Sequence, residues 1–384
     1  MQIGNLLQIL DDLLAFRTVS SESNLECIDY IKGILEGYGA RCVVQPDETG
    51  GKANLLASIG PNVPGGVVLS GHTDVVPVEG QTWSFDPWKL TQIDGRLYGR
   101  GTTDMKGFVA QMIVAAGLAK NRALLRPLHL AFSYDEELGC LGAWPMATLM
   151  KETLPDNAAV IVGEPTENRI VTSHKGIVTF VTDIKGHSVH SSRVHEGVSA
   201  VTESARLITW LDELMYKEAE TRKSNCFDPP FTTIHCGVVS GGIAANVVAP
   251  SSSFITDVRT IEGISPADYQ MLFEKYVSEV VLPRLRNRCP DVDIRITRRS
   301  LTPGLDPDPG NLAEVITRRI TGDNGTSAVS YATEAGVYQR AGFPVVVCGP
   351  GSIEQAHQAD EYIRLDELDR GLRLMERLVD DLAA

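Results

Sequence analysis

A histidine and an aspartate lie two residues apart, directly after a short apolar run. His72 and Asp74 follow residues 66–69, which are apolar and typical of a buried strand. In an open α/β sheet, ligands collect at the carboxyl ends of the strands. Imidazole and carboxylate groups together are common ligands of divalent metal ions. The motif therefore predicts a metal site where this strand ends.

Four other segments repeat this arrangement of an apolar run followed by residues of metal-binding types. Their polar residues are Asp104, the pair Glu136 and Glu137, Glu164, and His357. The resulting candidate ligands are imidazoles and carboxylates without thiolates, a set that suits zinc, with cobalt or manganese as alternatives. We therefore predict that strand ends from the whole chain assemble one site for two divalent ions.

Two ions at such a site need a bridging anion and about two further protein ligands each, with open positions for water and substrate. We assign His72 and Glu164 to one ion. Glu137 and His357 are assigned to the other ion, and Asp104 to the bridge between them. Each ion then has one imidazole and two carboxylates when the bridge is counted for both.

Asp74 and Glu136 are expected to support the chemistry without binding metal. Asp74 is close to His72 in sequence, and by accepting the ring N–H of His72 it would fix the tautomer of the ligand. Adjacent residues of a strand point to opposite faces, so Glu136 and Glu137 are expected to have different roles. We predict that Glu136 is the general base for the metal-bridging water, which acts as the nucleophile on the scissile carbonyl.

The predicted elements that position these residues alternate between helices and strands. Helices are predicted for residues 1–37, with a break near 18–21, and for 108–118, 312–321, 334–340 and 366–382; strands are predicted for 41–45, 54–59, 66–69, 128–134, 158–162 and 344–347. Such alternation is typical of an α/β layered domain with a central, mostly parallel sheet. The chemistry-bearing residues all fall in this part of the chain.

A different pattern occupies the middle of the chain. Strands are predicted for residues 178–185, 232–239, 254–259 and 292–298, and helices for 198–214 and 266–285. This β-α-β-β-α-β order is typical of a ferredoxin-like unit. We therefore predict a catalytic metal-binding domain of residues 1–176 and 300–384, with an inserted lid or dimerisation domain of residues 177–299.

Composition excludes several classes of partner and compartment. The net charge of −14 over 384 residues argues against nucleic acid and against anionic membranes as partners. The seven cysteines are scattered and form no Cys-x-x-Cys pair, which favours free thiols in a reducing compartment. Residues 1–16 lack the basic start of a signal peptide, and no apolar run is long enough to span a bilayer. A cytoplasmic protein is expected.

Residues 70–77, 99–107, 135–137 and 163–166 resemble motifs of a known family, in the same order and within a match that runs nearly end to end. The family is that of the dinuclear zinc amidohydrolases, which include acetylornithine deacetylase, succinyl-diaminopimelate desuccinylase, aminoacylase and glutamate carboxypeptidase. The resemblance implies the same metal roles that we assigned. It also implies homodimers that pair through the lid domain.

The resemblance further implies functional residues in the lid domain. His190, within residues 186–192, matches a lid histidine that completes the oxyanion hole, often from the dimer partner. Asn246, within residues 241–246, and Arg259 match contacts to the substrate, and Arg259 could pair bidentately with a substrate carboxylate. The other histidines, His129, His174, His195 and His235, are interpreted as structural.

Residues 331–336 and 348–362 are most similar to the acetylornithine deacetylase branch of this family. Ala332 and Ala359 depart from that branch at positions that touch no proposed ligand. The similarity implies hydrolysis of N-acetyl-L-ornithine to acetate and L-ornithine, for arginine synthesis. The alternatives are a deacylase of another N-acyl amino acid, a dipeptidase of the same family, or a metal-bound scaffold without activity, against which the intact Glu136 argues.

Overall fold

Two units with separate sheets make up the computed structural model, which describes residues 2–384. The first unit comprises the chain up to Ser173, together with Pro307–Ala328 and Thr333–Ala384. The second comprises His174–Asp306 and the short segment Val329–Ala332. The predicted lid domain, residues 177–299, lies inside the second unit, which extends further at both ends.

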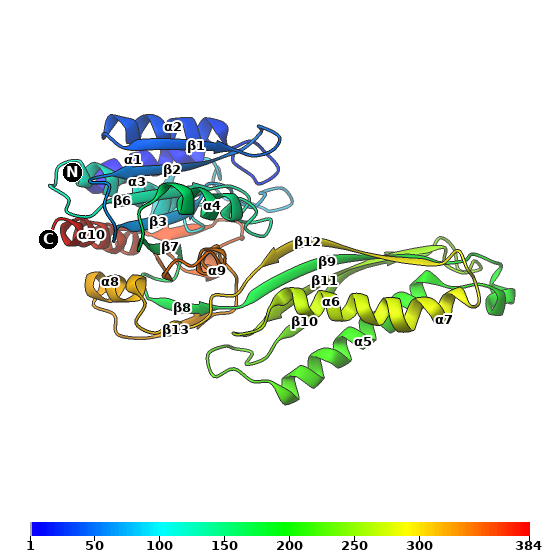
Figure 1. Ribbon diagram of the computed structural model, residues 1–384. Coiled ribbons are helices and arrows are strands. Elements are labelled where there is room, and N and C mark those ends of the chain that lie inside the picture. Colours follow the sequence, from blue (N-terminus) through cyan, green and yellow to red (C-terminus); the bar gives the residue numbers. More distant parts are fainter. Residues whose placement is uncertain (1) are drawn as a thin grey trace. The chain divides into compact units, whose positions relative to one another are not determined.

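An eight-stranded mixed sheet forms the centre of the first unit (Figure 1). Its order is β1 (Arg41–Pro46), β2 (Ala53–Ile59), β6 (Leu128–Ser133), β3 (Val67–His72), β7 (Ala159–Pro165), β14 (Val345–Gly349), β8 (Val171–His174) and β13 (Ser327–Val329). The central strands β6, β3, β7 and β14 pair in parallel, whereas β1 and β2 extend the sheet antiparallel. The predicted α/β fold with a central, mostly parallel sheet is confirmed.

Helices cover both faces of this sheet. The helices of the first unit are α1 (Gln2–Ala15), α2 (Leu25–Gly37), α3 (Lys106–Ala119), α4 (Ala143–Thr153), α8 (Leu312–Thr321), α9 (Ala335–Arg340) and α10 (Leu365–Leu382). Val67 and Leu69 of β3 belong to the core shared with α1, α2, α3, α8 and α10. Ser70, the next residue of β3, instead contacts Tyr338 of α9. Because successive strand residues face opposite sides, α9 lies on the other face of the sheet.

Close packing between α3 and β7 requires a glycine beside a candidate ligand. A Cβ atom at Gly163 would lie 2.0 Å from the ring of Phe108, so no larger residue fits there. Apart from Lys106 and Gln111, helix α3 consists of small and apolar residues that are almost all buried, and this allows it to approach the sheet closely. This contact determines where the backbone of Glu164 enters the site.

A small sheet that was not predicted holds two loops of the first unit together. It has the order β15 (Tyr362–Arg364), β5 (Arg96–Tyr98) and β4 (Thr91–Ile93), all antiparallel. Each strand has only three residues, too few for a periodic signal in the sequence. The pairing of β5 with β15 brings the loop of Asp104 next to the loop of His357.

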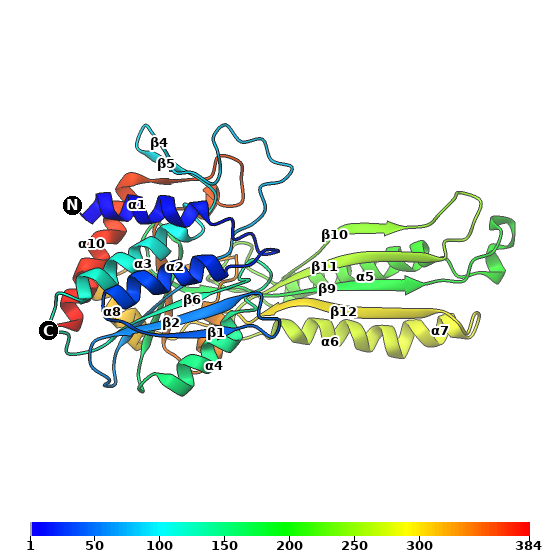
Figure 2. The same ribbon diagram turned by 90° about the horizontal axis from the view of Figure 1, so that it is seen from above.

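The second unit contains a four-stranded antiparallel sheet with helices on one face (Figure 2). Its strands, in sheet order, are β10 (Thr233–Gly241), β11 (Ser251–Thr260), β9 (Gly176–Lys185) and β12 (Asp293–Thr302), and its helices are α5 (Ala200–Thr221), α6 (Pro266–Tyr276) and α7 (Leu282–Arg286). Trp210 of α5 stacks on Tyr276 of α6 at a ring distance of 4.3 Å. The chain order is β-α-β-β-α-β, so the predicted ferredoxin-like pattern is confirmed, with a π-helical turn at Val277–Val281 between α6 and α7.

The cysteines and the lengths of the helices complete the description of the fold. All seven cysteines are free thiols, and four of them are buried. Between residues 2 and 384, no helix combines the length and apolarity that crossing a membrane requires.

Candidate metal centre

Each of the four parallel strands ends close to one of the predicted metal ligands. His72 is the last residue of β3, Glu164 lies near the end of β7, Glu137 follows β6, and His357 lies in the loop after β14. Asp104 comes from the loop before α3. Because parallel strands end at the same edge of the sheet, these residues meet in space.

Asp104 lies between the two histidines of the cluster. Its Oδ1 atom is 3.1 Å from His72 Nε2, and its Oδ2 atom is 3.1 Å from His357 Nε2. His72 Nε2 is also 3.7 Å from Glu164 Oε1, and His357 Nε2 is 3.1 Å from Glu137 Oε2. These contacts join the residues in the same pairs that the sequence analysis assigned, with Asp104 shared by both.

The carboxylates of the cluster are buried with too little positive charge around them. Burial, together with the neighbouring Asp104, raises the pKa of Glu137 to about 7 and that of Glu164 well above its ordinary value. Within the described residues, Glu164 Oε1 is buried and accepts no hydrogen bond. Because unpaired buried carboxylates are costly, the cluster fits bound cations. Two groups of three residues have ligand atoms within 4.8 Å of one another. One group is His72, Glu136 and Glu164, and the other is His72, Asp104 and Glu137.

Both histidines are surrounded by carboxylates, but His72 is buried and His357 is half exposed. Hydrogen bonds to Asp104 and Glu137 raise the pKa of His357 to about 11, although half of its side chain is exposed. Burial of His72 opposes its protonation, but Asp104 and Asp74 outweigh this effect and raise its pKa well above the ordinary value. Metal binding at these imidazoles therefore requires the release of protons.

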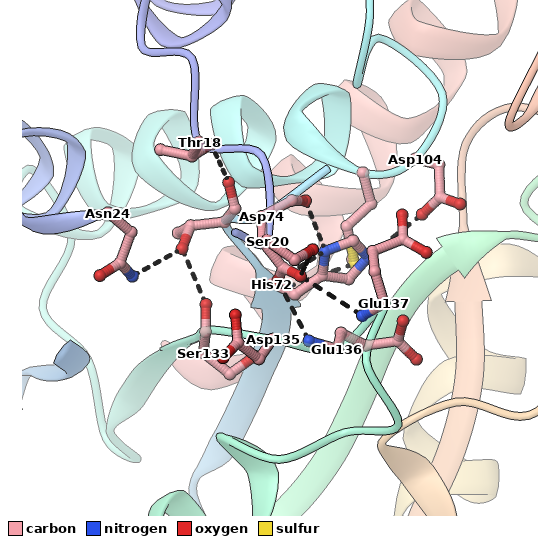
Figure 3. Close-up of polar contacts among 12 residues, drawn as sticks. Thr18, Ser20, Asn24, His72, Asp74, Asp104, Ser133, Asp135, Glu136 and Glu137 are labelled. Atoms are coloured by element: carbon pink, nitrogen blue, oxygen red, sulfur yellow. Dashed lines mark hydrogen bonds and ion pairs between the residues drawn. The ribbon is translucent and has the colours of Figure 1, made fainter. Parts of the chain in front are cut away.

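Asp74 supports both His72 and the turn of Glu136 and Glu137 (Figure 3). The Nδ1 atom of His72 is 2.9 Å from the main-chain oxygen of Asp74 and 3.5 Å from its Oδ1 atom. The Asp74 carboxylate also accepts the backbone N–H groups of Glu136, at 3.1 Å, and Glu137, at 3.3 Å. One buried aspartate thus orients a histidine and two glutamates of the cluster.

The strand argument that separated Glu136 from Glu137 is wrong, because both lie in a turn after β6 ends at Ser133. Their side chains nevertheless differ in surroundings. Glu137 contacts His357, whereas Glu136 lies with His72 and Glu164, and the Cys140 thiol donates to its Oε1 atom at 3.3 Å. Burial and the neighbouring carboxylates raise the pKa of Glu136 well above its ordinary value.

Sequence reasoning missed a group of hydroxyl and amide side chains before α2. Ser20 donates to Asp74 Oδ2 at 2.7 Å, and Asn24 donates to the Thr73 hydroxyl at 3.0 Å (Figure 3). The Thr18 hydroxyl donates to the backbone oxygen of Thr73. In the sequence this stretch indicates only a helix start, so its role in holding the end of β3 depends on the fold.

Glu334 is a second buried carboxylate whose surroundings were not predicted. It accepts hydrogen bonds from the hydroxyls of Ser70, Ser133 and Tyr338, and it is 1% exposed. These partners lie on β3, β6 and α9, so Glu334 links these three elements through hydrogen bonds. The sequence pointed to its segment only as similar to a family motif.

The predicted lid residues His190 and Asn246 lie side by side in the second unit. The backbone of His190 pairs with Val247, and the N–H of Ser191 donates to the Asn246 oxygen at 2.9 Å. His190 Nδ1 accepts the N–H of Ser192 at 3.2 Å. Ser192 thus contacts Nδ1 of the His190 ring through both its backbone and its hydroxyl group.

Arg259, the predicted substrate contact, already has two partners within the second unit. Its Nε atom donates to Asp257 Oδ1 at 3.1 Å, and its Nη1 atom donates to the Ser330 oxygen at 3.3 Å. Its side chain is 38% exposed. These contacts hold one edge of the guanidinium group in place and leave part of it open to solvent.

Comparison with known proteins identifies the family. The sequence profile of Peptidase family M20/M25/M40 matches residues 68–381, which include every proposed ligand. The chain belongs to this family. The predicted relationship to the dinuclear metallohydrolases is thus confirmed, and the protein is an enzyme of the M20 type.

Relatives of similar length share this family. The acetylornithine deacetylase of Proteus mirabilis is 33% identical over 392 residues, covering 99% of this chain and 97% of that enzyme. The acetylornithine deacetylase of Pectobacterium carotovorum is 35% identical over 373 residues, or 94% of each chain. The M20 metallo-carboxypeptidase Sso-CP2 of Sulfolobus solfataricus has the same fold, with a TM-score of 0.79 at 17% identity over 98% of this chain and 99% of that one.

Proposed function

We propose that this M20 enzyme holds two divalent metal ions at the cluster around Asp104. His72 and Glu164 are assigned to one ion, Glu137 and His357 to the other, and Asp104 to both. The contacts of the two Asp104 oxygens with the two histidines are the observation that carries the proposal. The imidazole and carboxylate donors favour zinc, with cobalt as the alternative.

Amide hydrolysis at this site needs a proton acceptor and a donor to the oxyanion. When bound, the ions would polarise the scissile carbonyl and make water more acidic. Glu136 takes the proton from the attacking water and delivers it to the leaving amine, while Asp74 holds Glu136 through its backbone N–H. His190 donates a hydrogen bond from Nε2 to the oxyanion, and Asn246 and Arg259 bind the remainder of the substrate.

The proposed substrate is N-acetyl-L-ornithine, which would be cleaved to acetate and L-ornithine in arginine synthesis. Support comes from the relatives named acetylornithine deacetylase, which align with this chain over nearly their whole length. The free thiols support a reducing compartment, and we propose the cytoplasm.

The test is turnover of a substrate panel by zinc-loaded and cobalt-loaded protein. The panel contains N-acetylornithine, N-succinyl-diaminopimelate, N-acetylmethionine and a dipeptide. We expect N-acetylornithine to have the highest kcat/KM, with activity lost in a chelator and restored by either metal. A preference for another member of the panel would contradict the substrate, whereas activity that persists without metal would contradict the metal centre.

We also propose a homodimer that forms through the second unit. Among the described strands, β10 is an edge strand that pairs only with β11. It exposes Val238 and Val239, at 57% and 60%, and Ile243 in the next loop is 71% exposed. An apolar edge of this kind favours pairing with another chain. Val238→Glu should shift sedimentation towards the monomer, whereas a wild-type monomer at working concentration would contradict the dimer.

A further inference from the structure

A buried ion pair outside the cluster contacts both loops that carry ligands of one proposed ion. Arg100 and Glu361 are each about 1% exposed, and Arg100 Nη1 lies 2.7 Å from Glu361 Oε2. The pair reaches the segments that carry proposed metal ligands through their main-chain groups. Glu361 binds main-chain groups of the segment that contains Asp104, and Arg100 reaches the segment that contains His357 through Gln358 and Gln81.

Glu361 holds the backbone of the Asp104 loop. Its Oε1 atom accepts the N–H groups of Thr103, at 2.9 Å, and Asp104, at 3.1 Å. Its Oε2 atom accepts the N–H of Gly101 at 3.1 Å in addition to Arg100. Three backbone donors of one loop thus converge on one buried carboxylate. Such charge-assisted hydrogen bonds are strong, and they determine the position of the Asp104 backbone.

Arg100 extends this contact to the His357 loop. Its Nη1 atom donates to the backbone oxygen of Gln358 at 3.3 Å, and its Nη2 atom donates to Gln81 Oε1 at 2.6 Å. Gln81 in turn donates through Nε2 to the backbone oxygen of His357 at 2.9 Å. A weaker contact of 3.4 Å reaches the oxygen of Pro77. The pair therefore holds the backbone around the half-exposed His357 through Gln358 and Gln81.

Apart from the shared Asp104, the ligands of the other ion, His72 and Glu164, are held by different groups. His72 is held by Asp74, and Glu164 by its place in β7, next to Gly163 and α3. His357, in contrast, comes from a loop without regular strand pairing, and its backbone has a φ of +62°. The half of the cluster that contains His357 thus depends on side chains for its geometry.

We propose that Arg100 and Glu361 are positioning residues, linked through Gln81, that hold Asp104 and His357 at ligand distance and thereby set the affinity of the ion that His357 completes. This inference rests on the proposed dinuclear centre. Groups that orient metal ligands from behind typically change affinity by about 10- to 100-fold when they are replaced. Because Asp104 is shared by both ions, loss of Glu361 should also weaken the ion assigned to His72 and Glu164, but less than the ion of His357, which loses the support of two ligands.

The experiment titrates the metal-free full-length protein with cobalt, followed by its visible absorption, and with zinc, followed by calorimetry. Glu361→Gln removes the charge and turns one acceptor into a donor that faces backbone N–H groups. Gln81→Leu removes the link to His357 without leaving a carboxylate buried and unpaired, so it serves even where Glu361→Gln does not fold. We expect the ion of His357 to lose about tenfold or more in affinity in Glu361→Gln and less in Gln81→Leu, and the ion of His72 and Glu164 to stay within about threefold in Gln81→Leu.

The matched control is Glu203→Gln in the second unit. Glu203 is 2% exposed and forms ion pairs with Arg206 and Arg284, whose side chains are 57% and 50% exposed, so its replacement also removes the charge of a buried carboxylate from an ion pair. It should lower stability and leave both metal affinities unchanged. Wild-type affinities in both test variants, or equal weakening of both ions in Gln81→Leu, would overturn the inference while the dinuclear centre stands. A wild-type protein that binds no metal would overturn the proposed function itself.

Discussion

The two units place their candidate functional residues in opposite environments. In the first unit, His72, Asp104 and Glu164 are buried, and every ligand is supported by a strand end or by a buried polar partner. In the second unit, His190 and Asn246 are exposed and held mainly through their backbone. The first unit therefore supplies buried charged groups in fixed positions, whereas the second supplies exposed hydrogen-bonding side chains that are less constrained.

The energetic consequences follow from burial. A carboxylate cluster in a closed site is unfavourable until cations or protons neutralise it, and the raised pKa values of Glu136, Glu137 and Glu164 express this cost. The exposed groups of the second unit remain hydrated and carry no such cost. Replacement of an assigned ligand should therefore affect metal content and chemistry in the first unit, whereas replacement of a candidate residue in the second should affect chemistry alone.

The largest expected effect is that of Glu136→Gln. Loss of the proposed proton acceptor should lower kcat by about 10³-fold, because general acid–base catalysis contributes in this range. The two metal ions should stay bound, because Glu136 is not among the assigned ligands. Turnover is measured with metal content determined on the same sample. Glu152→Gln, an exposed position on α4, is the control, and a kcat within tenfold of wild type in Glu136→Gln would break the assignment.

His190→Asn should have the next largest effect. Removal of an oxyanion donor lowers kcat by about 10²-fold, with little change in metal content, since His190 belongs to the second unit. His187→Asn is the matched control, because His187 is exposed and lies three residues earlier. Loss of metal in His190→Asn would contradict the separation of roles between the units, and equal losses in both variants would contradict the choice of His190.

Acid sensitivity of the first unit should depend on a buried histidine. Burial, and to a lesser extent Arg41, lowers the pKa of His129 in the first unit to about 4, from an ordinary value of 6.5. As the pH falls from 6.5 towards 4, the unfolded chain binds this proton before the folded one does, so stability falls with pH. The loss should reach about 3 kcal/mol near pH 4. Hydrogen exchange of β2 and β6 between pH 4 and 7 measures it.

His129→Asn should flatten this dependence, although it lowers stability at neutral pH by leaving space where the ring was. His235→Asn, at an exposed position of β10 in the second unit, should leave the pH dependence of exchange in β2 and β6 unchanged. An unaltered slope in His129→Asn would show that another group controls acid unfolding of the first unit.

Arg259→Lys should have the smallest effect. Lysine keeps the charge but cannot bind a carboxylate through two parallel N–H groups, so KM should rise about tenfold while kcat changes little. Arg295→Lys, at an exposed position on β12, is the control. An unchanged KM with lower stability of the second unit would assign Arg259 to its contacts with Asp257 and Ser330 alone.

Much of the fold was predictable because the relevant signals are local. Apolar runs of strand length predicted the central strands, and the change to β-α-β-β-α-β order predicted the inserted unit. Elements of three residues, such as β4 and β15, were missed, because their pairing depends on partners far away in the sequence. The turn of Glu136 and Glu137 was misinterpreted as strand for a related reason, since its backbone is held by Asp74.

By itself, the sequence determined the residue types of the candidate ligands and their places after apolar runs, from which we predicted the pairing of His72 with Glu164 and of Glu137 with His357. Only the tertiary structure decided which buried groups hold them. Ser20, Glu334 and Glu361 look like ordinary polar residues in the sequence, and their partners lie tens to hundreds of residues away. The physical reason is that a ligand motif is local, whereas burial and hydrogen-bond satisfaction exist only once distant segments pack together.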